Sequence, residues 1–215
     1  NTSLLIWFIP QIEKIVCWLI KSIKPAEEED FRLLYIGGNS IMETPELSVL
    51  EAQKEIQSYA ERTQRMFGFV RDLLVTTDGA AFSKLFSRIE KYESICDSME
   101  VEIAKYLDGV SDAHLSDVTK AKIRAMLREI SEIERIGDSC YNMACTINRK
   151  RNGKEDFTEQ QYEYIQQIMT LTDNALTQMK NLMLGRKENY DANLSFNIET
   201  EINNYRNQLR SQNIN

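Results

Sequence analysis

The sequence predicts an all-α protein, and three features of its pattern carry that prediction. Apolar residues recur at three- and four-residue steps through most of the chain after residue 44, as they do along one face of an amphipathic helix. Capping signals stand at the ends of these stretches, and none of them has the β-branched alternation of a strand. The stretches are joined by short connections, which favours antiparallel neighbours in a helical bundle. With 215 residues, of which 42% are hydrophobic, the chain is long enough to bury a core.

Five helices are expected after residue 44. Thr44 followed by Pro45 is a typical start, because proline is favoured at the first helical position. The Asp78-Gly79 pair predicts a turn between the first two helices. Thr158 with Gln161 predicts a capping box at the start of the fourth helix. The expected ranges are 45–74, 79–107, 112–151, 158–184 and 191–210.

The same periodicity predicts which side chains face the core. In the first helix the inward residues are Leu47, Leu50, Ile56, Tyr59, Met66, Phe67, Val70, Leu73 and Leu74. In the third helix they are Val118, Ile123, Met126, Leu127, Ile130, Ile133, Cys140, Ala144 and Ile147.

Charge and composition exclude several function classes. A net charge of -7 and a pI near 5.0 disfavour binding to a nucleic-acid backbone, so no nucleic-acid partner is expected. The single histidine, His114, lies outside any Glu-x-x-His motif, which argues against a carboxylate-bridged metalloenzyme. No nucleophile and base constellation appears in the sequence, so a non-enzymatic protein is expected. The four cysteines lack Cys-x-x-Cys spacing and are interpreted as reduced, mostly buried thiols.

An apolar segment at residues 1–24 precedes the helices, and residues 25–44 are interpreted as a charged linker to a helical domain at 45–215. Pro10 and the polar residues after it interrupt the apolar run near its middle. The segment therefore fits the end of a membrane span or a helix lying in the membrane interface. A buried terminal helix of a soluble protein is the alternative. The sequence is expected to be part of a longer protein.

Two acidic pairs, Glu93-Ser-Ile-Cys-Asp97 and Glu134-Arg-Ile-Gly-Asp138, repeat the spacing Glu-x-x-x-Asp within helical stretches. A four-residue step returns to nearly the same face of a helix, so the two carboxylates of each pair project side by side. At an effective dielectric near 20, unit charges roughly 5 Å apart repel by about 3 kcal/mol. Each pair therefore requires a cation, an Arg or Lys partner, or protonation.

Further oxygen-bearing side chains extend the two pairs. Glu90 and Glu100 continue the acidic stripe of the second helix, and Asn142 follows Asp138 by one turn of the third. A solvated charged face is the alternative interpretation of this stripe, with Arg128 and Arg135 available to neutralise the row on the third helix.

The candidate metal ligands are therefore Glu93, Asp97, Glu134 and Asp138, with weaker candidates at Glu90, Glu100, Asn142 and Glu199. Oxygen ligands suit Mg, Mn, Ca or Fe better than structural zinc. The sequence predicts a divalent or trivalent metal ion but does not decide among Mg, Mn, Ca, Fe and Zn. Gly137, which costs about 1 kcal/mol relative to alanine inside a helix, suggests a close approach of a neighbouring helix or of a bound ion.

The pair Glu93-x-x-x-Asp97, followed about forty residues later by Glu134-Arg-Ile-Gly-Asp138-x-x-x-Asn142, resembles the PhoU family. The resemblance extends over about residues 47–215. It implies antiparallel helical bundles of PhoU type, one of three helices and an incomplete second one. It also implies a multinuclear metal site on the two acidic pairs. In the second bundle, Glu199-Thr-Glu-Ile-Asn203 stands where another Glu-x-x-x-Asp motif is expected, with Asn in place of Asp, and a sixth helix is missing.

Residues 1–24 and the junction that follows are similar to the boundary between the membrane domain and the PhoU-like tail of bacterial sodium/phosphate cotransporters. This similarity implies a regulatory domain on the cytoplasmic side of the inner (plasma) membrane, outside the transport pore. Its partner would be a membrane transporter domain on the same polypeptide. A stand-alone PhoU-type adaptor of phosphate signalling, acting on the phosphate-transport machinery in trans, is the alternative. Whether the chain forms a homo-oligomer is left open.

Overall fold

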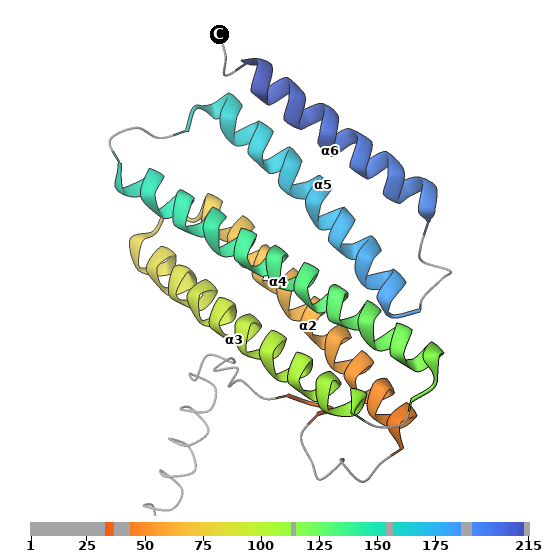
Figure 1. Ribbon diagram of the computed structural model, residues 1–215. Coiled ribbons are helices and arrows are strands. Elements are labelled where there is room, and N and C mark those ends of the chain that lie inside the picture. Colours follow the sequence, from red (N-terminus) through yellow and green to blue (C-terminus); the bar gives the residue numbers. More distant parts are fainter. Residues whose placement is uncertain (1–32, 37–43, 113–114, 154–156, 186–190, 213–215) are drawn as a thin grey trace, which may run out of the picture. The chain divides into compact units, whose positions relative to one another are not determined.

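The protein is all-α over the part of the chain that the structure describes, as the sequence predicts. A computed structural model describes residues 33–36, 44–112, 115–153, 157–185 and 191–212, which lie in one compact unit, Leu33–Asn215 (Figure 1). The apolar segment 1–24, most of the linker, Cys17 and His114 lie outside these residues. The helices are α2 (Pro45–Val75), α3 (Gly79–Ser111), α4 (Asp117–Asn152), α5 (Glu159–Met183) and α6 (Ala192–Gln212).

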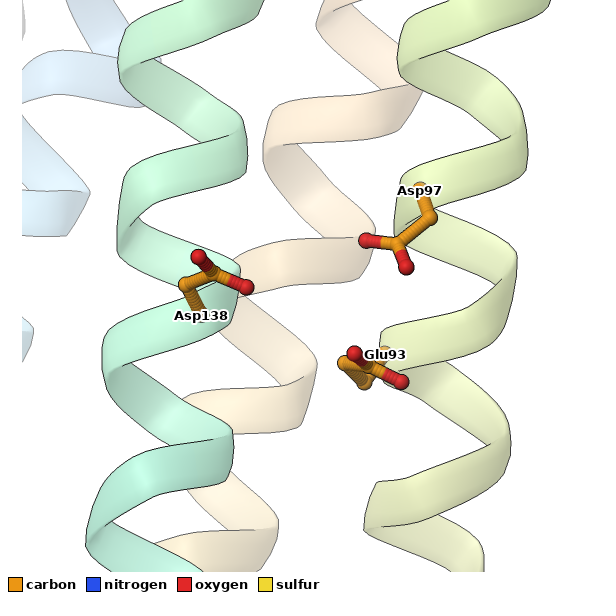
Figure 2. A group of neighbouring side chains, drawn as sticks. All are labelled: Glu93, Asp97 and Asp138. Atoms are coloured by element: carbon orange, nitrogen blue, oxygen red, sulfur yellow. The ribbon is translucent and has the colours of Figure 1, made fainter.

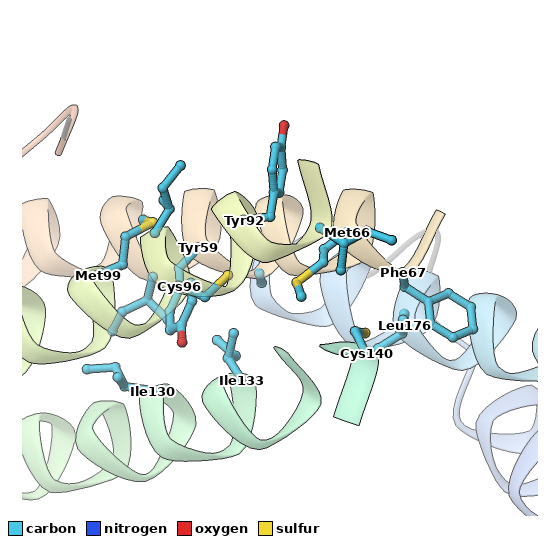
Figure 3. Packing of buried hydrophobic residues seen from close by; sticks show 14 of the residues in the cluster. Tyr59, Met66, Phe67, Tyr92, Cys96, Met99, Ile130, Ile133, Cys140 and Leu176 are labelled. Atoms are coloured by element: carbon cyan, nitrogen blue, oxygen red, sulfur yellow. The ribbon is translucent and has the colours of Figure 1, made fainter. Parts of the chain in front are cut away.

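Three of these helices form a bundle around one apolar core. α2, α3 and α4 each pack against the other two, and α5 lies along α2 with α6 against α5 (Figure 1). The core draws buried aliphatic, aromatic and sulfur side chains from all three bundle helices (Figure 3). This arrangement confirms the predicted all-α helical bundle, with three helices packed together and α5 and α6 beside them. None of the described helices is both long enough and apolar enough to cross a bilayer.

Local capping explains most helix ends. The Asp78 side chain accepts a hydrogen bond from the Ala81 amide at 2.7 Å and starts α3. At the start of α5 the Thr158 hydroxyl accepts from the Gln161 amide, and the Gln161 side chain accepts from the Thr158 amide. This confirms the predicted capping box, which satisfies two amides that have no partner within the helix.

Two helix boundaries differ from the prediction. α3 continues through Gly109 to Ser111, because a glycine inside a helix costs only about 1 kcal/mol and does not end the helix by itself. α4 begins at Asp117 rather than at 112. Its N-cap is Ser116, whose hydroxyl accepts from the Thr119 amide at 3.1 Å.

The inward face of α2 also differs near its start. Leu47 and Leu50 are 43% and 50% exposed, whereas Val49 and Ala52 are buried. The buried positions lead to Ile56 and Tyr59 in regular three- and four-residue steps, and the two leucines fall outside that register. On α4, Val118 was likewise expected in the core but is 80% exposed, because it lies in the first turn, before the first buried residue, Ile123.

A buried carboxyl group fastens the chain before the bundle to α2. Glu55 is fully buried, and its Oε2 accepts hydrogen bonds from the amides of Leu34 and Tyr35 at 2.9 and 2.7 Å. Ile36 then joins the apolar core. Part of the predicted linker therefore packs on the bundle.

Polar contacts accompany the packing of α5 on α2. Arg71 Nη1 lies 2.8 Å from the Asp173 carboxylate, and Gln64 Nε2 donates to Asp173 and to the Thr177 hydroxyl. Leu176 is buried beside them, so both apolar and polar contacts hold α5 in place.

Candidate metal centre

Three carboxylates from two helices meet on the surface of the bundle. Glu93 and Asp97 project from α3 and Asp138 projects from α4, on the same side of the two packed helices (Figure 2). One oxygen of each lies within 4.8 Å of the others. Among the described residues this is the one group of three potential metal ligands drawn from Asp, Glu, His and Cys.

The helix register places these carboxylates at the rim of a close helix contact. Cys96, next to Asp97, is buried against α4, and Gly137, next to Asp138, is buried against α3. A Cβ atom on Gly137 would lie 3.7 Å from the Cys96 Cβ, which is an ordinary van der Waals distance. The predicted close approach at Gly137 is therefore present, but alanine would also fit there. The two adjacent acidic residues are brought together by this packing.

The pKa values of Glu93 and Asp97 are both raised. Partial burial is the largest cause at Glu93, followed by the negative charges of Asp97, Asp138 and Glu90. Burial and then Asp138 raise the pKa of Asp97. Both shifts mean that the charged forms lack compensating interactions.

Glu134 belongs to the same electrostatic group. It lies one turn before Asp138 on α4, and its pKa is raised by partial burial and then by Asp138, both through charge and through a side-chain hydrogen bond. Glu100 and Asp97 raise it further across the groove. Six acidic side chains thus share this surface. We call it the acidic groove, and its residues are Glu90, Glu93, Asp97, Glu100, Glu134 and Asp138.

The sequence offered two arginines of α4 as neutralising partners for the row on this helix. Arg135 pairs instead with Glu132 at 2.9 Å. Arg128 is exposed. Protons or a bound cation would relieve the repulsion among the carboxylates of the groove.

The two remaining candidate ligands are both exposed. Asn142 lies one turn after Asp138 on α4, and Glu199 lies on α6. Glu199 does not enter the group of carboxylate oxygens that meet within 4.8 Å.

The arrangement suits a hard cation. The groove offers carboxylate oxygens and neither histidine nor thiolate, since the nearby Cys96 is buried and burial raises its pKa to about 11. Oxygen-only ligand sets are typical of Mg²⁺, Ca²⁺ and Mn²⁺ sites. Because the ligands come from α3 and α4, a cation bound there would join the two helices.

One core tyrosine has a feature that the sequence did not predict. Tyr59 on α2 is fully buried, and its hydroxyl oxygen has no hydrogen-bond partner. Helical periodicity predicts that this tyrosine faces the core, but it does not predict which groups surround the hydroxyl.

The sequence comparisons point to the same bundle. Residues 56–147 match the PhoU domain, a regulatory, non-enzymatic family associated with phosphate transport or signalling. The match begins in α2 and ends in α4, and it contains every residue of the acidic groove. No curated protein and no solved structure matches the chain.

Proposed function

We propose that this chain is a regulatory, metal-binding PhoU-like domain of a sodium-dependent phosphate cotransporter, and that it acts without catalysis. The observation that carries the proposal is the acidic groove, in which Glu93, Asp97 and Asp138 from two helices bring one oxygen each within 4.8 Å of the others. Glu134 adds a fourth ligand of the same chemistry one turn away. The PhoU match over the same helices supports a role in phosphate-transport regulation.

A bound cation would act on the packing of the bundle. It would neutralise the repulsion among the carboxylates and join α3 to α4, which otherwise contact each other through small and apolar side chains such as Gly137 and Cys96. The loaded bundle would then present a more rigid face to its partner. Metal occupancy would thus change how strongly the domain docks on the transport machinery.

The cotransporter context is the part of the proposal that rests on residues 1–44. We assign 1–24 to a membrane-proximal apolar segment, 25–44 to a linker and 45–215 to the regulatory domain on the cytoplasmic side of the plasma membrane. A stand-alone phosphate-signalling adaptor is the competing function. Retention of the full-length protein in membranes after a carbonate wash would support the cotransporter, and its complete release would support the adaptor.

Metal content tests the proposal at the groove. Purified protein equilibrated with Mn²⁺ and then desalted should retain bound Mn²⁺, whereas Asp97→Asn combined with Asp138→Asn should lose most of it. Glu102→Gln, an exposed residue of α3 outside the groove, is the matched control and should retain Mn²⁺. Equal and negligible Mn²⁺ in all three proteins would refute the metal site.

A further inference from the structure

Tyr59 buries a hydroxyl group that forms no hydrogen bond in the structure. The side chain is 0% exposed, and its hydroxyl is among the few buried polar atoms of the described residues that lack a partner. Leaving a buried donor unpaired costs about 1–3 kcal/mol, so native proteins nearly always satisfy such groups. Phenylalanine would fill the same space in the core without this cost. The hydroxyl is therefore expected to have a partner in some state of the protein.

The hydroxyl points toward α4, one of the two helices that carry the acidic groove. In Figure 3 the Tyr59 side chain extends from α2 toward α4, the helix that carries Ile130 and Ile133 of the same core cluster. Glu134 of the acidic groove directly follows Ile133 on α4.

The electrostatic surroundings of Tyr59 identify the same groove. Burial is the largest cause that raises the pKa of Tyr59, followed by Cys96 and then by the charges of Glu100, Glu134 and Asp97. All three carboxyl groups belong to the acidic groove. The neutral hydroxyl is therefore a hydrogen-bond donor without a partner in the present arrangement, and it lies within the electrostatic influence of these carboxyl groups.

The other polar groups nearby already have contacts. The Thr63 hydroxyl donates to the backbone carbonyl of Tyr59 at 3.1 Å, and it lies 3.7 Å from the Cys96 sulfur. Glu100 and Glu134 are only half-buried, so their carboxylates can turn toward the inner side of the groove. They are the acceptors with the freedom to meet Tyr59.

We propose that Tyr59 is a positioning residue of the metal centre, whose hydroxyl donates a hydrogen bond to a carboxylate of Glu100 or Glu134 once a cation has drawn the groove together. The inference rests on the metal binding proposed above. Tyr59 would thus add a residue of α2 to a metal centre whose ligands come from α3 and α4. Cation binding at α3 and α4 would then also be transmitted to α2.

The test compares Mn²⁺ binding by the wild-type chain, Tyr59→Phe and Tyr92→Phe. Tyr92 is the matched control, because it is a buried tyrosine of the same bundle whose hydroxyl points away from α4 (Figure 3). A hydrogen bond to a charged acceptor leads us to expect about tenfold weaker Mn²⁺ binding for Tyr59→Phe, measured by titration calorimetry. Tyr92→Phe should bind like the wild type. Without metal, Tyr59→Phe should unfold at the same temperature as the wild type or higher.

A spectroscopic measurement distinguishes a hydrogen-bonding role of Tyr59 in the metal centre from a role in core packing alone. Mn²⁺ should change the near-ultraviolet absorption of tyrosine in the wild type and in Tyr92→Phe, but not in Tyr59→Phe. Equal Mn²⁺ affinity of Tyr59→Phe and the wild type would overturn the role of Tyr59 while leaving the metal centre intact. If Tyr59→Phe fails to fold, the wild-type spectrum decides, since binding of Mn²⁺ without a tyrosine signal overturns the inference. Absence of Mn²⁺ binding by the wild type would overturn both the inference and the proposed metal centre.

Discussion

Single residues of the acidic groove carry the functional argument. Glu93, Asp97 and Glu134 all have raised pKa values, and at each of them the charge of Asp138 is among the causes. These groups are largely open to solvent, so their repulsion is screened and each contributes only a modest free energy. Their common sign nevertheless gives the folded protein a preference for protons or cations at this surface.

This preference predicts how stability depends on pH. At carboxyls with raised pKa the folded state binds protons more tightly than the unfolded state, so the free energy of unfolding should fall as pH rises from about 4 through the raised values. Urea denaturation of the metal-free protein at pH 4.5 and pH 7 measures the fall. The fall should be smaller in Asp97→Asn with Asp138→Asn, because two of the repelling charges are absent. It should also shrink when Mn²⁺ is added to the wild type at pH 7.

An identical pH dependence in the wild type and the double variant would contradict this electrostatic account. The comparison is needed because other carboxyl groups titrate in the same range, and only the difference between the two proteins reports on the groove.

The sequence predicted the identity of the groove residues better than their partners. The Glu-x-x-x-Asp spacing places Glu93 beside Asp97 because helical geometry is local. Which side chains face each other across α3 and α4 depends on how the helices are rotated, and this was not readable from the spacing. Tyr59 was therefore predicted only as a core residue, and Arg135 was offered as a neutralising partner although it pairs with Glu132.

At the scale of helices, the most informative departure from the prediction lies at the start of α2. The buried residues between Val49 and Tyr59 are apolar except for Glu55, which is buried directly before Ile56. The sequence did not predict Glu55 as a buried residue, because its partners are backbone amides of a segment that has no helical periodicity. No sequence pattern predicts such a contact.

Glu55 predicts a measurable effect on the segment that it holds. Glu55→Ala removes two hydrogen bonds to the Leu34 and Tyr35 amides, and hydrogen bonds to a charged group are each worth about 1.5–3 kcal/mol. Because the other carboxyl oxygen, Oε1, is buried without a hydrogen-bond partner, removing the carboxyl group also relieves a desolvation cost, and we expect the variant to lose about 2–3 kcal/mol of stability. Chymotrypsin should cut after Tyr35 faster than in the wild type.

Glu61→Ala, at an exposed position of the same helix, serves as the control and should leave both the stability and the cleavage rate unchanged. If Glu55→Ala were cleaved no faster than the control, the segment would not depend on this carboxyl group.

Helix ends were predictable where a side chain caps them within three residues. The capping box of Thr158 and Gln161 is local and was confirmed. The turn predicted at Asp78-Gly79 lies where the Asp78 side chain caps the start of α3. The start of α4 was misplaced because Asp112 and Ser116 are both acceptable caps by residue type. Only the structure distinguishes them, with Ser116 capping the Thr119 amide.

At the scale of the whole described unit, the fold class was predictable and the use of its surfaces was not. An all-α bundle follows from periodicity and short connections. The metal proposal requires two helices to present acidic residues at the same height of one groove, which is a property of tertiary packing. α5 and α6 stand outside that groove, and the Asp173 contacts to Arg71 and Gln64 accompany the packing of α5 on α2.

The most direct test of the central claim locates the cation itself. Crystals of the protein grown with Mn²⁺ should show an anomalous scattering peak between Glu93 and Asp97 of α3 and Asp138 of α4. The Tyr59 hydroxyl should then lie within hydrogen-bond distance of Glu100 or Glu134. A peak confined to other surfaces, or no peak at saturating Mn²⁺, would contradict the claim that this groove is a metal centre.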